Sequence, residues 1–196
     1  VPTATNSPEQ VDPDQMRFSS GPAWLISVAA FLLASATTSS AGGWTVKDGA
    51  GRTVEVASTS RIVTVGGAVT EIVYALGFGD RVVAVDITSN FPSSAKAKPS
   101  VGYMRALSPE GVLSLAPTIV LAIEGAGPPD AIEVLSRSSI PFVVVPEGYD
   151  EESVLRKVRF VAQALGVSEK GEAMAREIEE DFAAVKAMRA TIVSKR

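Results

Sequence analysis

Tyr103 and Arg105 are the residues of this sequence whose side chains are best suited to bind a metal-containing ligand. A tyrosinate oxygen is a hard anionic donor that suits ferric iron. A free phenol has a pKa of about 10, so its ionisation near neutral pH requires a nearby cation, which Arg105 can supply. The guanidinium can also bind a carboxylate of a ligand. The alternative is a loop tyrosine that packs its ring, next to a solvated arginine.

A further charged residue, Glu110, follows in the segment Ser108-Pro109-Glu110. Ser108 can cap a helix, Pro109 suits the first helical position, and an acidic side chain in the first turn favours the positive end of a helix. The sequence therefore predicts a short surface helix with Glu110 at its start. Stabilisation of that helix is by itself a sufficient role for the glutamate.

The composition excludes several classes of protein. The 196 residues include no histidine and no cysteine, so imidazole and thiolate metal sites and disulfides are ruled out. The 18 basic and 22 acidic residues give a formal charge of −4, and no basic run of the kind that binds nucleic acid is present. A nucleophile elbow and a phosphate-binding loop are missing as well, so we expect a binding protein and not an enzyme.

Apolar strands and helices alternate between residues 61 and 166. Short, continuous apolar strands separated by helices are typical of an α/β fold with a parallel sheet and helices on both faces. We expect strands at 62–65, 81–85, 118–122 and 141–145, helices at 69–76, 131–137 and 151–165, and a β-hairpin formed by 45–49 and 52–56. Residues 86–102 show no periodicity and are expected to form a long loop, which in a compact domain is usually functional.

The C-terminal segment, Ser168 to Ser194, is predicted to be one long helix, because it contains no proline and its only glycine is near its start. At 1.5 Å per residue it would be roughly 40 Å long. Apolar residues recur on one side of it, and we interpret it as a strut that leads toward a second domain. The alternative is a terminal helix that packs entirely on the domain before it.

The N-terminal segment has the parts of a secretory signal peptide. Met16 and Arg17 precede a 13-residue apolar run, Trp24 to Ala36, which is too short to span a bilayer as a helix. Small residues suited to cleavage follow, with cleavage after Ala41 or after Ala36. We therefore expect an upstream extension at residues 1–15 and a signal peptide at residues 16–41. A buried core helix is the alternative for the apolar run.

Two stretches of the sequence carry a family resemblance. They are Arg61 to Gly77, and Val101 to Leu113 with Gly102-Tyr103-x-Arg105 followed by Leu107-Ser108-x-Glu110-Gly111. Together they resemble the periplasmic binding proteins that serve ABC importers of cobalamin, siderophores and haem, and the second stretch resembles the haemin-binding branch. The resemblance implies an N-terminal lobe at residues 42–166 and a linking helix at 167–196, before a second lobe that the chain does not reach.

The resemblance also implies roles for the residues introduced above. Tyr103 matches the axial ligand of the haem iron, Arg105 lies beside it, and Glu110 matches a glutamate that docks into arginine pockets of the membrane permease. The chain is then expected to be a monomeric periplasmic protein that binds haem as cargo and neither binds nucleic acid nor spans a membrane. A ferric siderophore or cobalamin is the alternative ligand on the same fold.

Overall fold

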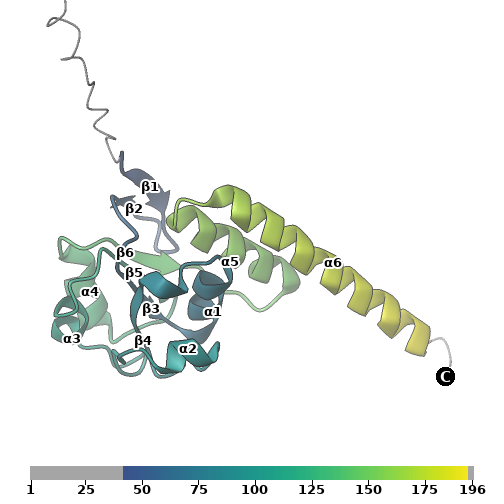
Figure 1. Cartoon of the computed structure of the whole chain (residues 1–196), viewed down its shortest axis with the longest axis horizontal. Coiled ribbons are helices and arrows are strands. Elements are labelled where there is room, and N and C mark those ends of the chain that lie inside the picture. The colour runs from purple at the N-terminus through teal and green to yellow at the C-terminus, as the bar shows by residue number, and fades with distance from the viewer. Residues whose placement is uncertain (1–41, 194–196) are drawn as a thin grey trace, which may run out of the picture. The chain divides into compact units, whose positions relative to one another are not determined.

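The computed structural model describes residues 42–193, the last three by their backbone only, so the predicted signal peptide and extension at 1–41 lie outside the described residues. The centre is a four-stranded parallel sheet of β3 (Ile62–Val65), β4 (Val82–Val85), β5 (Ile119–Ile123) and β6 (Phe142–Val145). The strand order is β4-β3-β5-β6 (Figure 1). Every residue of β3 and β5 is buried, as expected for apolar strands covered on both faces. The predicted parallel sheet is confirmed.

Helices cover both faces of this sheet (Figure 1). On one face α1 (Gly67–Ala75) and α5 (Glu151–Ala164) bury residues such as Val69 and Val161. On the other face α3 (Pro109–Leu113) and α4 (Pro129–Arg137) bury Val112 and Leu135. Burial of one such side chain contributes about 1.5–3 kcal/mol to folding. The predicted α/β architecture is therefore confirmed, with one apolar core on each side of the sheet.

The predicted β-hairpin is present as β1 (Trp44–Lys47) and β2 (Thr53–Val56), which pair in antiparallel fashion. The buried Asp48 holds its turn, because one carboxylate oxygen accepts hydrogen bonds from the backbone of Ala50 and Arg52 and the other pairs with the Arg52 guanidinium at 2.5 Å. The same guanidinium donates to the carbonyl of Phe142 in β6. The hairpin is thereby attached to the edge of the sheet.

The connections on either side of β4 differ in detail from the expectation. A short 3₁₀ helix, η1 (Gly79–Arg81), precedes β4, so the strand begins one residue later than predicted. Within the expected loop 86–102 there is one helical turn, α2 (Ser93–Lys96), and Ser100 forms an isolated parallel bridge with Val85. Elements of three or four residues are too short to produce a recognisable hydrophobic period, which is why the sequence did not indicate them.

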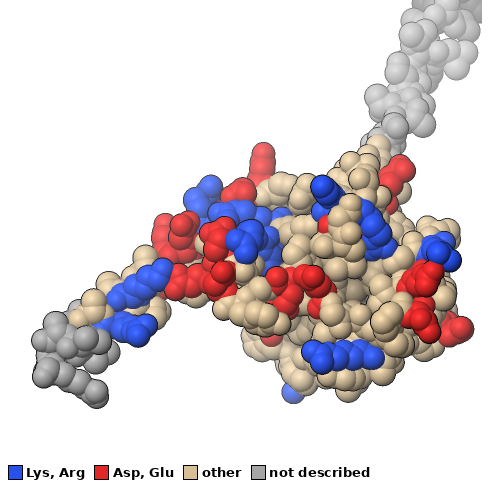
Figure 2. Space-filling view, turned by 180° about the vertical axis from the view of Figure 1, so that it is seen from behind, with Lys and Arg blue, Asp and Glu red and all other residues tan. Residues whose placement is uncertain are grey.

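The predicted long helix is present as α6 (Ser168–Val193). Its first half packs on α5, with Ala175 buried and Met174, Ile178 and Phe182 against the same cluster. Farther along, Val185 and Met188 are exposed, and the helix extends beyond the lobe (Figure 1). In Figure 2 acidic and basic side chains lie together along its part near the lobe, and basic ones lie farther out. Its role as a strut toward a second domain stays a prediction.

Candidate ligand-binding site

The carboxyl ends of the four parallel strands meet at one edge of the sheet. From β3 the chain proceeds to β4 on one side, and it later returns to place β5 on the other side of β3. Ligands of open α/β sheets bind at such a switch point, outside the carboxyl ends of the strands. The loops that follow the strands at this edge therefore define the candidate site.

The predicted site residues Tyr103 and Arg105 lie in a turn that is fixed at this edge. Between them Met104 packs against both apolar cores, and its carbonyl accepts a hydrogen bond of 2.9 Å from the amide of Gly127, in the loop after β5. The carbonyl of Gly127 in turn accepts one from the amide of Leu107. Tyr103 and Arg105 are both exposed. Within residues 42–190, neither side chain makes a hydrogen bond or an ion pair, so both are available to a ligand.

Gly102 directs the chain into this turn. Its φ of +91° lies in the left-handed region that favours glycine. The carbonyl of Gly102 accepts a hydrogen bond of 2.9 Å from the amide of Ile87, and the amide of Val101 donates to the carbonyl of Val85. The segment just before Tyr103 is thus an extension of the sheet beside β4.

A buried carboxylate organises the loop after β4. Asp86 is 1% exposed and accepts four hydrogen bonds: from the amide of Gly66 at 3.0 Å, from the amide and hydroxyl of Thr88 at 3.1 and 2.6 Å, and from the hydroxyl of Ser89 at 2.7 Å. The hydroxyl of Thr70 extends this network to Ser89. These bonds hold residues 86–89 against the start of α1.

Large apolar side chains stand exposed on these loops. Ile87 is 59% exposed, Phe91 65%, Tyr103 43% and Tyr149 100%. All four follow the carboxyl end of β4 or β6. Ligands of open α/β sheets bind at this edge, so these side chains are candidates for contact with a ligand. Of these four, only Tyr103 was predicted from the sequence. Ile87 and Phe91 were missed because their loop shows no periodicity. The available signal was the presence of large apolar residues within a polar loop.

The third tyrosine differs from the other two. Tyr74 is half-buried in α1 and packs so closely on Gly79 that an added Cβ there would overlap its ring. Burial raises the pKa of the Tyr74 phenol. The Tyr74 side chain is therefore part of the packing of the lobe, and it is a suitable control for experiments on Tyr103.

Glu110 lies where the sequence placed it, in the first turn of α3. Ser108 caps the helix by accepting a hydrogen bond of 3.2 Å from the amide of Gly111. The backbone amide of Glu110 and the hydroxyl of Ser108 both hydrogen-bond to the Glu110 carboxylate and lower its pKa. The carboxylate is exposed, so helix stabilisation and contact with a basic partner are compatible. No hydrogen bond or ion pair joins Glu110 to Tyr103 or Arg105 within the described part of the chain.

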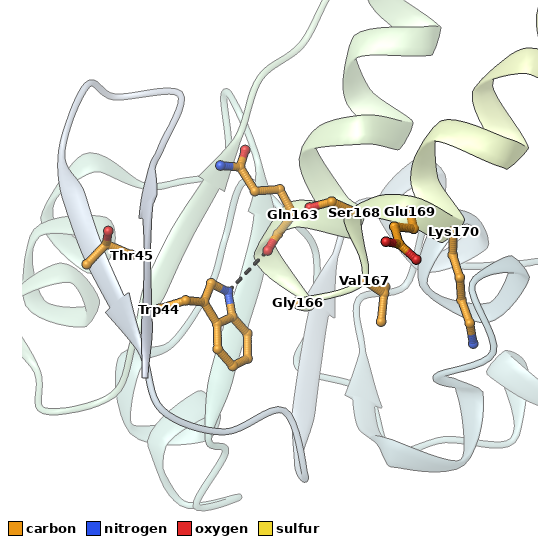
Figure 3. A pocket seen from close by; sticks show the side chains of 8 residues that line it. All are labelled: Trp44, Thr45, Gln163, Gly166, Val167, Ser168, Glu169 and Lys170. Atoms are coloured by element: carbon orange, nitrogen blue, oxygen red, sulfur yellow. Dashed lines mark hydrogen bonds between the residues drawn. The ribbon is translucent and has the colours of Figure 1, made fainter. Parts of the chain in front are cut away.

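One hollow, with a volume of about 640 Å³, is away from this edge. It lies between the hairpin and the turn from α5 to α6, and its lining residues are Trp44, Thr45, Gln163, Gly166, Val167, Ser168, Glu169 and Lys170 (Figure 3). The indole of Trp44 donates a hydrogen bond of 3.1 Å to the carbonyl of Gln163. None of the exposed residues of the candidate site lines this hollow.

The described residues contain neither a cluster of metal-binding side chains nor a membrane-spanning helix. Among them, no group of three or more Asp, Glu, His or Cys side chains could hold a metal ion. Likewise, no helix within residues 42–193 is long and apolar enough to cross a membrane.

Comparison with known proteins gives a consistent result. A family model described as "Periplasmic binding protein" matches residues 62–195. A vitamin B12-binding protein of Vibrio parahaemolyticus is 28% identical over 127 residues, which is 65% of this chain and 46% of that protein. An uncharacterised ABC transporter substrate-binding lipoprotein of Bacillus subtilis, YvrC, is 32% identical over 124 residues, or 62% of this chain and 39% of that protein.

Solved structures that resemble the chain include periplasmic haem-binding proteins. BhuT in complex with two haems is 41% identical, with a TM-score of 0.64, over 67% of this chain and 50% of BhuT. RhuT from Roseiflexus sp. RS-1 in its apo form is 41% identical, with a TM-score of 0.62, over 65% of this chain and 49% of RhuT. The chain thus spans about half the length of the proteins it matches, and its fold corresponds to the N-terminal lobe of the two-lobed structures.

Proposed function

The chain belongs to the periplasmic binding protein family, which consists of solute-binding proteins and not of enzymes, and we propose that it captures haem for an ABC importer. The observation that carries this proposal is the Tyr103–Arg105 turn, which is fixed at the carboxyl edge of the sheet and presents both side chains to solvent. Relatives with haem-binding function support the same ligand.

In this proposal Tyr103 binds the ferric iron through its phenolate oxygen, and the phenol proton is released to solvent. Arg105 either favours the phenolate by its charge or pairs with a haem propionate, for which the planar guanidinium is well suited. Ile87 and Phe91 offer apolar surface to the flat macrocycle.

The location and partner of the protein are part of the same proposal. Residues 16–41 act as a signal peptide that directs a monomeric protein to the periplasm. Residues 42–166 are the N-terminal lobe, and residues 167–196, described by the structure as far as 193, are the segment that links it to a second lobe. Glu110 docks on arginine side chains of the permease, where an exposed charge sets orientation and association rate more than affinity.

A second candidate ligand is cobalamin or a ferric siderophore. The similarity to a vitamin B12-binding protein favours it. The two candidates differ in their dependence on Tyr103, because a siderophore or a corrinoid brings all the ligands of its own metal ion. Loss of the Tyr103 hydroxyl should then leave binding nearly unchanged.

The test is a titration of the full-length mature protein with haemin, followed by visible absorption. We expect saturable one-site binding with a high-spin ferric spectrum, and a Tyr103→Phe variant should lose or alter that spectrum. Tyr74→Phe is the matched control, since Tyr74 is half-buried in α1, and it should keep the wild-type spectrum. A folded wild-type protein without saturable haemin binding would refute the haem assignment and leave cobalamin and siderophores as ligands to titrate.

A further inference from the structure

Tyr149 is a fully exposed aromatic residue in a loop that is held on both sides. Its side chain is 100% exposed, so the ring buries nothing against the described part of the chain. Two residues earlier, the amide of Glu147 donates a hydrogen bond of 3.1 Å to the carboxylate of Glu124. One residue later, Asp150 caps α5 by accepting a hydrogen bond of 2.7 Å from the amide of Ser153. The backbone around Tyr149 is thus fixed, while its ring is free.

A buried lysine holds this loop to the helix that follows it. Lys157 of α5 is 7% exposed, and its ammonium group forms an ion pair with the Glu147 carboxylate. An unpaired buried charge is strongly unfavourable, so this pair ties the loop to α5. Gly148 adds to the constraint, because a Cβ at that position would overlap the side chain of Ser153.

The loops that carry Tyr149 and Tyr103 share one anchoring segment. The Tyr149 loop is bound to Glu124, and the Tyr103 turn is bound to Gly127 by two backbone hydrogen bonds. Both anchors belong to the short loop after β5. Three residues of extended chain span at most about 11 Å, so the Cα atoms of Glu124 and Gly127 lie within that distance of each other. The Tyr103 and Tyr149 loops are therefore anchored on the same short segment at the carboxyl edge of the sheet.

We infer that Tyr149 is a second aromatic contact for the ligand that Tyr103 binds, and that Lys157, acting through Glu147, is the residue that positions it. The inference rests on the proposed ligand-binding function. It specifies a ligand with an extended flat face, because such a face can contact aromatic rings on two loops together, by edge-to-face or offset stacking.

The first test is a haemin titration of the full-length protein with substitutions of Tyr149. Removal of an aromatic contact costs about 0.5–1.5 kcal/mol, so Tyr149→Ala should weaken the Kd about three- to tenfold. Tyr149→Phe should bind as the wild type does, because the ring and not the hydroxyl makes the contact. Val134→Ala on α4 is the control, since it shortens another exposed apolar side chain that lies outside the site. A wild-type Kd for Tyr149→Ala overturns the inference.

The second test examines Lys157 with a double-mutant cycle. Lys157→Met removes the charge and keeps most of the side-chain volume, and it should weaken haemin binding severalfold. If Lys157 acts by positioning Tyr149, the same substitution should have no further effect on the Kd in the Tyr149→Ala protein. Additive effects would contradict the positioning role, because they would show that Lys157 acts by another route. Circular dichroism spectra establish that each variant is folded.

A third measurement separates this inference from the proposed function. Nitration of tyrosine by tetranitromethane, read by mass spectrometry, should modify Tyr149 rapidly in the free protein and slowly at saturating haemin. If the wild-type protein does not bind haemin, the haem proposal is wrong, and the same Tyr149→Ala comparison is made with cyanocobalamin and with ferrichrome. Equal affinity of wild type and variant for the ligand that does bind overturns the inference, and a wild type that binds none of the three overturns both proposals.

Discussion

Replacement of Asp86 by asparagine tests how the loop after β4 is held at the candidate site. Each carboxylate oxygen of Asp86 accepts one hydrogen bond from a backbone amide and one from a hydroxyl. An asparagine side chain replaces one of these oxygens by an NH₂ group, which cannot accept. Whichever oxygen is replaced, one backbone amide, of Gly66 or of Thr88, and one hydroxyl lose their acceptor.

The magnitude follows from this count. A hydrogen bond to a charged group contributes about 1.5–3 kcal/mol, and two are lost. The hydroxyl can rotate and accept a hydrogen bond from the new amide group, which offsets part of its loss, whereas the backbone amide cannot. We therefore expect Asp86→Asn to lower the free energy of unfolding by about 2–4 kcal/mol. Because the loop carries Ile87 and Phe91, haemin binding should weaken as well.

The assay combines urea unfolding of the full-length protein with hydrogen exchange. The urea midpoint should fall with an unchanged m-value, and faster exchange should be concentrated at whichever amide loses its acceptor, that of Gly66 or that of Thr88. Asp80→Asn is the matched control, because Asp80 is exposed in η1 and should tolerate the same change within about 0.5 kcal/mol. The reasoning is refuted if Asp86→Asn is no more destabilising than this control and exchange at the two amides is unchanged.

Further predictions concern Glu110, the contact between α5 and α6, and the exposed part of α6. Glu110→Gln should reduce haem uptake in vesicles that contain the permease severalfold and leave the haemin Kd unchanged; an unchanged uptake rate would exclude docking through this residue. Hydrogen bonds from its own amide and from Ser108 lower the pKa of the Glu110 carboxyl in the folded protein. The ionised carboxylate therefore stabilises the fold above the unfolded pKa of about 4.3, and this stabilisation is lost as the pH falls through the lower folded pKa. An NMR titration of Glu110 would show the lowered pKa. Gly171→Val should destabilise the lobe by about 1–3 kcal/mol in urea unfolding, because a Cβ at Gly171 overlaps Ala162 of α5. Met188→Ala on the exposed part of α6 should change stability by less than about 0.5 kcal/mol, and a larger loss would show that this part of the helix is packed.

Much of the fold could be predicted because the strands and helices have distinct patterns. Residues 62–65, 118–122 and 141–145 are continuous apolar runs, and burial on both faces of a parallel sheet requires such runs. The cap at Ser108 and the proline after it fixed the start of α3. Elements of a few residues, such as α2 and η1, escaped prediction because they are shorter than a hydrophobic period.

The candidate site was predicted in part. Tyr103, Arg105 and Glu110 were predicted as site residues from their types and spacing. The structure places all three at exposed positions, with Tyr103 and Arg105 in the same turn. Their functional roles stay predictions that the experiments above address. Ile87, Phe91 and the Asp86 network were missed, because nothing in an aperiodic loop indicates which of its residues are turned inward and which outward.

The sequence by itself determined the α/β class, the long final helix and the chemistry available to the site, since these depend on local periodicity and on which residue types are present. Only the tertiary structure decided which loops meet. The loops of Tyr103 and Tyr149, 46 positions apart in the sequence, are both anchored on residues 124–127, through backbone hydrogen bonds and the Glu124 carboxylate. Main-chain groups are alike for nearly every residue type, so backbone hydrogen bonds between distant segments leave no pattern in the sequence. These hydrogen bonds form only when the parallel strands bring their carboxyl ends together.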